Sequence, residues 1–104
     1  MAVFTVLYPA AEGAKFDHDY YNATHIPLVK EAFAATGLTG VQVLRGLSGG
    51  AGGAAPFVAI ANITFRDAEA LRASLSGPRA AEVMADVAKF TDIQPIAQVS
   101  VVAA

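Results

Sequence analysis

The chain has 104 residues, of which 55% are hydrophobic and 15% charged, and it contains no cysteine. The missing cysteines exclude disulfides, thiolate metal sites and a cysteine nucleophile, and the net charge of −2 with scattered Lys and Arg residues argues against nucleic acid as a partner. Average domains are roughly 45–50% apolar and 25% charged, so this chain has surplus apolar surface. We expect a single domain, residues 1–104, that pairs with a second copy of itself.

The first half of the chain predicts a strand followed by a helix. Residues 2–8 form an apolar, β-branched run that stops at Pro9, which is typical of a strand. After a loop over residues 10–15, Asp17 is placed to cap a helix, and Gly37 suits the left-handed residue that ends one.

Two further strands are expected at residues 41–47 and 57–65, joined by the glycine-rich segment 46–56. This segment leads into a strand and lacks the Gly-Lys-Ser/Thr ending of a phosphate-binding loop. It therefore predicts a flexible hairpin connection.

The last third of the chain predicts helix, helix and strand. Asp67 is placed to cap a helix that Gly77-Pro78 ends, and Pro78 suits the first position of the next helical segment, which continues over residues 80–90. Residues 94–102 form the last strand. The order strand, helix, strand, strand, helix, strand predicts an α+β protein with the ferredoxin-like, split βαβ plan and an antiparallel sheet.

The predicted sheet is apolar on both faces. In the third strand Phe57, Ala59, Ala61, Ile63 and Phe65 share one face, while Val58 and Ile60 begin the other. Helices cover only one face of such a sheet, so the other would be polar in a monomer. The sequence thus predicts a homodimer that packs sheet against sheet.

Residues 16–28 hold both histidines and two of the three tyrosines. His18, Tyr21 and His25 fall on one stripe of a helix at i, i+3 and i+7. Pro27 has no N–H and disfavours helical geometry before it, so a kink is expected near His25.

Several of these residues resemble the EthD family. The segments are Leu7-Tyr8-Pro9, Phe16-Asp17, Tyr20-Tyr21, His25 and Pro27-Leu28, then Ala61 to Phe65 with Asp67, and finally Ala85-Asp86-Val87 with Phe90-Thr91-Asp92.

This resemblance covers almost the whole chain and implies a dimeric α+β barrel. It also implies an association with oxidative degradation. The wider superfamily includes cofactor-free monooxygenases of polyketide quinones, muconolactone isomerases and haem proteins, so the fold alone selects no reaction.

His25 and Tyr21 are the candidate catalytic residues. Histidine, with an unperturbed pKa of about 6.5, exchanges protons near neutrality, and Tyr21 lies one turn away to bind His25 or a substrate oxygen. The alternatives are a structural histidine bonded to a backbone carbonyl at the kink, and a core aromatic ring.

Three further polar residues are candidates for substrate binding. Asn62 stands in mid-strand, where it either meets a polar group across a dimer interface or lines a pocket. Arg45 would attract an anion at a pocket mouth, or lie on the surface, and Asp92 would bind ligand or support a turn. Two histidines seven residues apart fit no zinc spacing, so neither metal nor cofactor is expected.

These features predict a small protein acting on a hydrophobic oxygenated molecule, such as a phenol, quinone, lactone or polyketide fragment. The reaction would be cofactor-independent oxidation or isomerisation by proton transfer, as in an oxidoreductase or an isomerase. The alternative is a non-catalytic binding or accessory protein. The N-terminus lacks the basic residues of a secretion signal and no apolar run spans a bilayer, so no membrane partner and a cytoplasmic location are expected.

Overall fold

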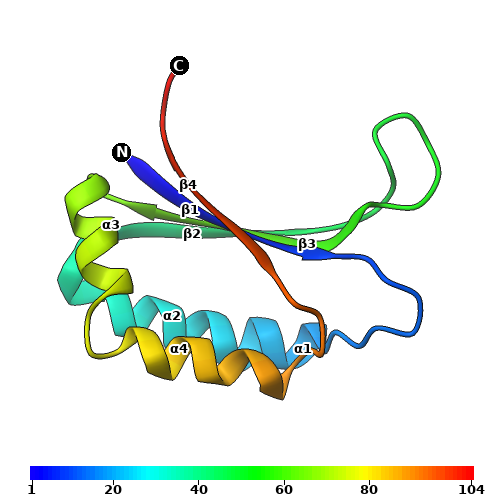
Figure 1. Ribbon diagram of the computed structural model, residues 1–104, viewed down its shortest axis with the longest axis horizontal. Helices are drawn as coiled ribbons and strands as arrows, with labels where there is room; N and C mark the ends of the chain where they lie inside the picture. The colour runs from blue at the N-terminus through cyan, green and yellow to red at the C-terminus, as the bar shows by residue number, and fades with distance from the viewer.

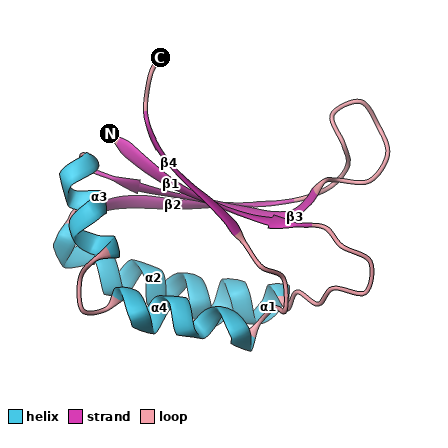
Figure 2. Cartoon of the chain, viewed as in Figure 1, coloured by secondary structure: helices cyan, strands magenta, loops and turns pink.

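The computed structural model describes residues 1–104 as an antiparallel sheet with all its helices on one face (Figures 1 and 2). The strands lie in the order β2-β3-β1-β4, and every neighbouring pair is antiparallel. The strands are β1 (Ala2–Pro9), β2 (Leu38–Arg45), β3 (Phe57–Phe65) and β4 (Ile96–Val101). This arrangement confirms the predicted ferredoxin-like α+β fold.

The helical segments fill the two connections that cross the sheet. The α-helices are α1 (His18–Tyr20), α2 (Ile26–Phe33), α3 (Ala68–Leu75) and α4 (Ala80–Asp86). The other helical turns are the π-helix η1 (Tyr21–His25) and the 3-10 helices η2 (Ala34–Thr36) and η3 (Val87–Lys89). None of these helices has the length and apolar character needed to cross a membrane.

The predicted helix caps are present. Asp17 Oδ1 accepts a hydrogen bond from the Tyr20 backbone N–H at 3.0 Å, and Asp67 Oδ1 accepts one from Ala70 N–H at 2.7 Å. Gly37 has φ +98°, the left-handed conformation that ends a helix. These local signals determine where the helices that cover the sheet begin and end.

Some predicted boundaries were wrong by a few residues. The second strand begins at Leu38, because an irregular register lets Leu38 pair with Phe65 before the regular ladder starts. It ends at Arg45, and Leu47 lies in the loop with 94% of its surface exposed. Pro78 precedes α4, which begins only at Ala80.

The core lies between the helices and one face of the sheet. In β3 the alternate residues Ala59, Ala61, Ile63 and Phe65 are all at most 5% exposed. Phe4 and Val6 of β1 pair with Ile63 and Ala61 and so lie on this same face. The period of two therefore separates a helix-covered face from a helix-free face.

On the helix-free face, the strand registers place side chains of similar chemistry opposite one another, so that they form rows across the sheet. One row across the four strands is aliphatic, and the next is made of three amides and a threonine. The aliphatic row contains Leu44, Ile60, Leu7 and Ile96, and the polar row contains Gln42, Asn62, Thr5 and Gln98.

Candidate functional site

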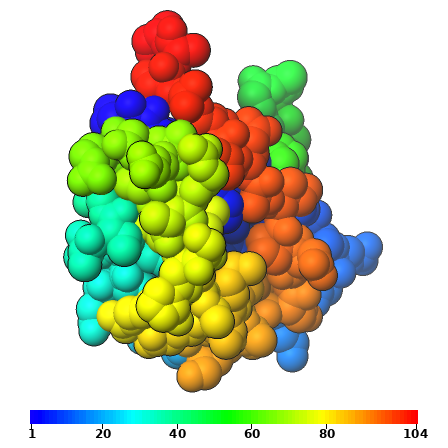
Figure 3. Space-filling view, turned by 60° about the vertical axis from the view of Figure 1, so that its left-hand side comes forward, coloured from blue at the N-terminus to red at the C-terminus, as the bar shows by residue number.

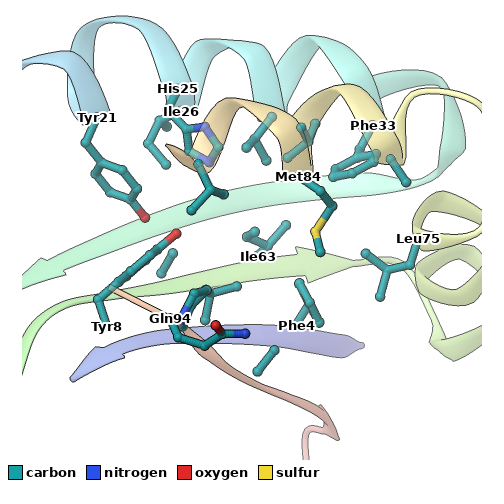
Figure 4. A pocket seen from close by; sticks show the side chains of 18 residues that line it. Phe4, Tyr8, Tyr21, His25, Ile26, Phe33, Ile63, Leu75, Met84 and Gln94 are labelled. Carbon is teal, nitrogen blue, oxygen red and sulfur yellow. The ribbon is translucent and has the colours of Figure 1, made fainter. Parts of the chain in front are cut away.

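A cavity of about 410 Å³ lies between the helix layer and the sheet. Its walls are apolar except at one end, where Tyr8, Tyr21, His25 and Gln94 gather (Figure 4). Figure 3 shows atoms of β1 in a hollow between the α4 region and the segment that leads into β4. The volume falls within the roughly 300–1,000 Å³ typical of small-molecule sites.

The helix that carries Tyr21 and His25 widens into a π-helical turn, η1. Ile26 N–H donates to the carbonyl of Tyr21, five residues earlier, and Pro27 follows without any N–H. The predicted kink near His25 thus takes the form of an inserted wide turn. As a result the ring of Tyr21 stacks on that of His25, with 5.5 Å between centroids and 20° between planes.

His25 is bonded to a carboxylate that lies 61 residues away in the chain. Its Nδ1 is 2.9 Å from Oδ2 of Asp86 in α4, and the two residues are only 4% and 6% exposed. The other carboxylate oxygen, Oδ1, accepts a hydrogen bond from the Tyr20 hydroxyl at 2.7 Å, and Lys89 Nζ lies 3.8 Å from it. This network excludes the alternative in which a backbone carbonyl holds His25.

The charges of this pair follow from burial and from hydrogen bonding. Burial lowers the pKa of His25, and the hydrogen bond and charge of Asp86 oppose this only in part. For Asp86, burial alone would raise the pKa, but hydrogen bonds from His25 and Tyr20 and the nearby positive charges hold it below its usual value. Near neutral pH the pair is therefore a neutral imidazole beside a carboxylate.

This protonation state fixes the tautomer of His25. A carboxylate only accepts hydrogen bonds, so Nδ1 carries the proton and Nε2 carries the free lone pair. Every fully buried side-chain nitrogen or oxygen has a partner. Nε2 has no protein partner, so it keeps contact with the cavity, where Figure 4 shows the ring. An unprotonated ring nitrogen thus borders the cavity.

Two tyrosine hydroxyls lie at the same end of the cavity. Tyr8 of β1 and Tyr21 of η1 are 2% and 1% exposed, and their hydroxyls point toward each other in Figure 4. Burial raises the pKa of Tyr8 to about 12 and also raises that of Tyr21. Both hydroxyls therefore stay protonated.

Phe90 holds these groups in place. Its ring packs against Tyr8, Tyr21 and His25 with centroid separations of 5.8, 4.9 and 4.6 Å. The backbone of the same residue accepts a hydrogen bond from Asp17 N–H at 2.7 Å, which joins the start of α1 to the end of η3. The aromatic rings and this bond together hold the helix that carries His25 against the segment that follows Asp86.

Of the predicted site residues, the structure brings together only His25 and Tyr21. Asn62 lies on the helix-free face, where Thr5 Oγ1 donates to its Oδ1 at 3.1 Å, and it is not among the residues that line this cavity. Arg45 is exposed at the end of β2 and does not line the cavity. Asp92 also lies outside it, and accepts a hydrogen bond from Lys15 N–H at 2.8 Å, which joins two segments 77 residues apart in the sequence.

Four residues of the site were not among the predicted site residues: Asp86, Tyr20, Tyr8 and Gln94. A signal for Asp86 was available, since it stands with Val83, Val87 and Phe90 on the buried side of its helix. A carboxylate among apolar neighbours at helical spacing needs a buried partner. No group of three or more His, Cys, Asp or Glu side chains is arranged to hold a metal ion.

Comparisons with known proteins identify the family of this chain and support its fold. Residues 12–94 match the EthD domain. An EthD-like protein from Ralstonia eutropha JMP134 shares 37% identity with a TM-score of 0.86, over 95% of this chain and 88% of that one.

Two more distant structures share the fold. An ethyl tert-butyl ether (EthD) family protein from Bacillus halodurans C-125 has 20% identity and a TM-score of 0.78, over 99% of both chains. A DABB family protein with a ferredoxin-like fold from Mesorhizobium loti has 17% identity and a TM-score of 0.63, over 99% of this chain and 97% of that one. No curated protein matches the chain. The family match covers most of the sequence, and the chain belongs to the EthD family.

Proposed function

We propose that this protein binds a small, largely apolar oxygenated molecule in the cavity and removes a proton from it. Suitable molecules are a phenol, quinone, lactone or polyketide fragment. The carbanion or phenolate made in this step serves either an isomerisation, in which a proton returns to another atom, or a cofactor-independent oxidation, in which dioxygen is the oxidant, in a degradative or tailoring pathway.

The observation that carries the proposal is the exposure of His25 Nε2 to an apolar cavity while Nδ1 is bonded to Asp86. Asp86 holds the tautomer and would stabilise the imidazolium that forms when Nε2 takes a proton. A purely structural histidine has no need of an unprotonated Nε2 that borders a cavity. The binding-only alternative predicts no such geometry.

We also propose that the protein works as a homodimer. The aliphatic row on the helix-free face includes Leu44 and Ile96, which are 44% and 56% exposed. A second copy related by a two-fold axis would lay its own aliphatic row against this one and its own polar row beside Asn62. This pairing would remove the surplus apolar surface from water and leave the cavity on the opposite side of each sheet.

The test of the catalytic proposal uses 2-tetralone, a neutral bicyclic ketone with acidic C–H bonds beside the carbonyl. Incorporation of deuterium from D2O, followed by NMR, should be faster with wild type than in buffer. His25→Ala should reduce the enzymatic rate by about 10²–10⁴-fold, the usual contribution of a general base. His18→Ala removes the histidine outside the cavity and is the matched control, with no expected change.

Two outcomes would contradict the catalytic role. The first is an equal rate of exchange with wild type and with a folded His25→Ala variant. The second is binding of 2-tetralone with no exchange above the rate in buffer, and this result would support the binding-only alternative. If His25→Ala fails to fold, His25→Gln replaces it, because glutamine keeps an N–H for Asp86 but has no basic nitrogen.

Tyr21→Phe tests whether Tyr21 acts with His25. It removes only a hydroxyl, so it should lower exchange less than His25→Ala does. Groups that act as one unit lose activity non-additively, so the double variant should be scarcely slower than His25→Ala alone. If the loss of rate in the double variant instead equals the product of the two single losses, Tyr21 and His25 act separately.

A further inference from the structure

The polar end of the cavity contains a pair of hydrogen-bond donors as well as a base. Tyr8 reaches it from the sheet and Tyr21 from the helix layer, so the hydroxyls meet from opposite walls (Figure 4). Figure 4 shows the two hydroxyls facing each other, and each influences the pKa of the other. Neither donates to a carboxylate, whereas the hydroxyl of Tyr20 donates to Asp86.

The hydroxyls of Tyr8 and Tyr21 have one O–H proton available for a ligand. Each phenol has one O–H, and when one donates to the other, the second proton stays free for an acceptor. Because both groups stay protonated, they act as donors and leave proton removal to Nε2 of His25. An oxygen atom of a ligand is the acceptor that this arrangement lacks.

The walls of the cavity specify the charge of that ligand. Among its lining residues there is no Lys or Arg, and the nearest buried charge is the carboxylate of Asp86. A carboxylate or phosphate ligand would enter an apolar space without a counter-ion, at a high desolvation cost. A neutral carbonyl compound avoids this cost and becomes negative only while its proton is on His25.

We propose that Tyr8 is a substrate-binding residue, and that with Tyr21 it binds the carbonyl oxygen of a neutral, enolisable ketone, ester or lactone. This inference rests on the proposed function. The C–H bond beside the carbonyl breaks and its proton goes to Nε2 of His25. Its electron pair forms a C=C bond, and the carbonyl pair moves to the oxygen that Tyr8 and Tyr21 hold.

The same proton then returns from the imidazolium to carbon. Return to the original carbon gives exchange, and return to another carbon of the conjugated system gives an isomer, so no oxidant or reductant is needed. The rest of the cavity, with Phe4, Phe33 and Leu75 at the far end, suits the apolar body of the substrate (Figure 4).

Three ligands of one shape test this assignment: tetralin, 2-tetralone and 1,2,3,4-tetrahydro-2-naphthoate. They differ only in having no oxygen, a neutral carbonyl or a carboxylate. Dissociation constants are measured for wild type, Tyr8→Phe, Tyr21→Phe and the double variant by displacement of the neutral fluorophore N-phenyl-1-naphthylamine. Each phenylalanine keeps the ring and removes the hydroxyl.

Wild type should bind 2-tetralone about tenfold more tightly than tetralin, the order of one or two neutral hydrogen bonds, and the carboxylate most weakly. The double variant should lose this preference while its affinity for tetralin is unchanged. Tyr8→Phe should also slow deuterium exchange into 2-tetralone about tenfold or more, because the bond strengthens as charge develops on oxygen.

The outcomes separate this inference from the proposed function. If wild type binds neither tetralin nor 2-tetralone, both are wrong. If the two bind equally well, or the double variant keeps the preference, or the carboxylate binds as tightly as the ketone, the assignment of Tyr8 is wrong and the cavity stands. Exchange that His25→Ala abolishes and Tyr8→Phe leaves unchanged would likewise overturn the role of Tyr8 alone.

Discussion

Polar side chains lie among aliphatic ones on both sides of the sheet, and their hydrogen bonds are satisfied in different ways. In the helix layer that covers one face, Asp86 and His25 are bonded to each other at 2.9 Å. On the helix-free face, Asn62 bonds to the neighbouring strand side chains Thr5 and Gln42, at 3.1 and 3.5 Å. The first network is shielded from water and the second is partly open to it.

This difference indicates different roles for the two networks. A buried carboxylate is tolerated only when its partners are complete, so the Asp86 network has one stable arrangement and can position a base. Amides can exchange partners at little cost, because each has both donors and acceptors. The row around Asn62 is therefore suited to a second sheet, whose polar groups would replace water.

The largest expected effect comes from a charge on the helix-free face. Ile60→Lys places an ammonium group in the aliphatic row, and burial of an unpaired charge in the proposed dimer interface should cost about 3–5 kcal/mol. Sedimentation should show wild type at twice the 10.7 kDa chain mass and the variant as a monomer or unfolded.

Leu47→Lys is the matched control, because Leu47 is already 94% exposed in the loop after β2. It should sediment like wild type. A wild-type protein that sediments as a stable monomer would refute the dimer, and Ile60→Lys would then change stability by no more than an ordinary surface substitution does.

The second effect concerns the buried network on the other face. Asp86→Asn should lower the free energy of unfolding by about 1–3 kcal/mol, since the amide cannot satisfy His25 and Tyr20 as a carboxylate does. An amide N–H facing Nδ1 would also move the imidazole proton to Nε2 and remove the base. Exchange into 2-tetralone should then fall at least as far as with His25→Gln.

Urea unfolding and the exchange assay measure these two effects. Asp92→Asn is the control: this carboxylate is exposed and accepts one backbone hydrogen bond, from Lys15, so less than about 1 kcal/mol and no loss of exchange are expected. Full exchange activity in a folded Asp86→Asn variant would contradict the proposed role of Asp86 in positioning His25.

The fold was predictable from the sequence because its signals are local. Alternation in β3 and the capping aspartates Asp17 and Asp67 each depend on a few neighbouring residues, and the structure contains all of them. The irregular start of β2 at Leu38 was missed, because pairing with β3, rather than local composition, creates it.

The site was less predictable because it joins distant segments. His25 and Tyr21 stood out by residue type, but Asp86, the hydrogen-bond partner of His25, comes from α4, in the second helical connection. For Asn62 and Arg45 the residue type left two alternatives open for a similar reason. Only the strand register shows that Asn62 faces away from this cavity and that Arg45 stands at the end of a strand.

The smallest expected effect is a loss of stability in mild acid, and it comes from the helix-covered face alone. Burial keeps the pKa of His25 below about 6.5, while the unfolded chain takes up a proton near that value. Between neutral pH and the lower folded pKa the unfolded state therefore binds more protons, so stability falls as the pH decreases, by at most about 1.4 kcal/mol per pH unit.

The groups around His25 allow this window to be assigned. Asp86 has a lowered pKa, so its contribution disappears only below about pH 4, and the hydroxyls of Tyr8, Tyr20 and Tyr21 have raised pKa values and stay protonated throughout. Titration between pH 7 and 5 can thus be attributed to the histidines.

Urea unfolding at several pH values between 7 and 5 should show the slope in wild type and its loss in His25→Gln. His18→Gln should retain a slope, because the buried His25 is still present; His18 is half-buried near the start of its helix, and burial lowers its pKa as well. A slope that disappears with His18 and survives without His25 would mean that the imidazole of His25 titrates as freely as in the unfolded chain. The neutral base assigned to the cavity would then be wrong, while the amide row and the aliphatic row on the other face would keep their proposed role.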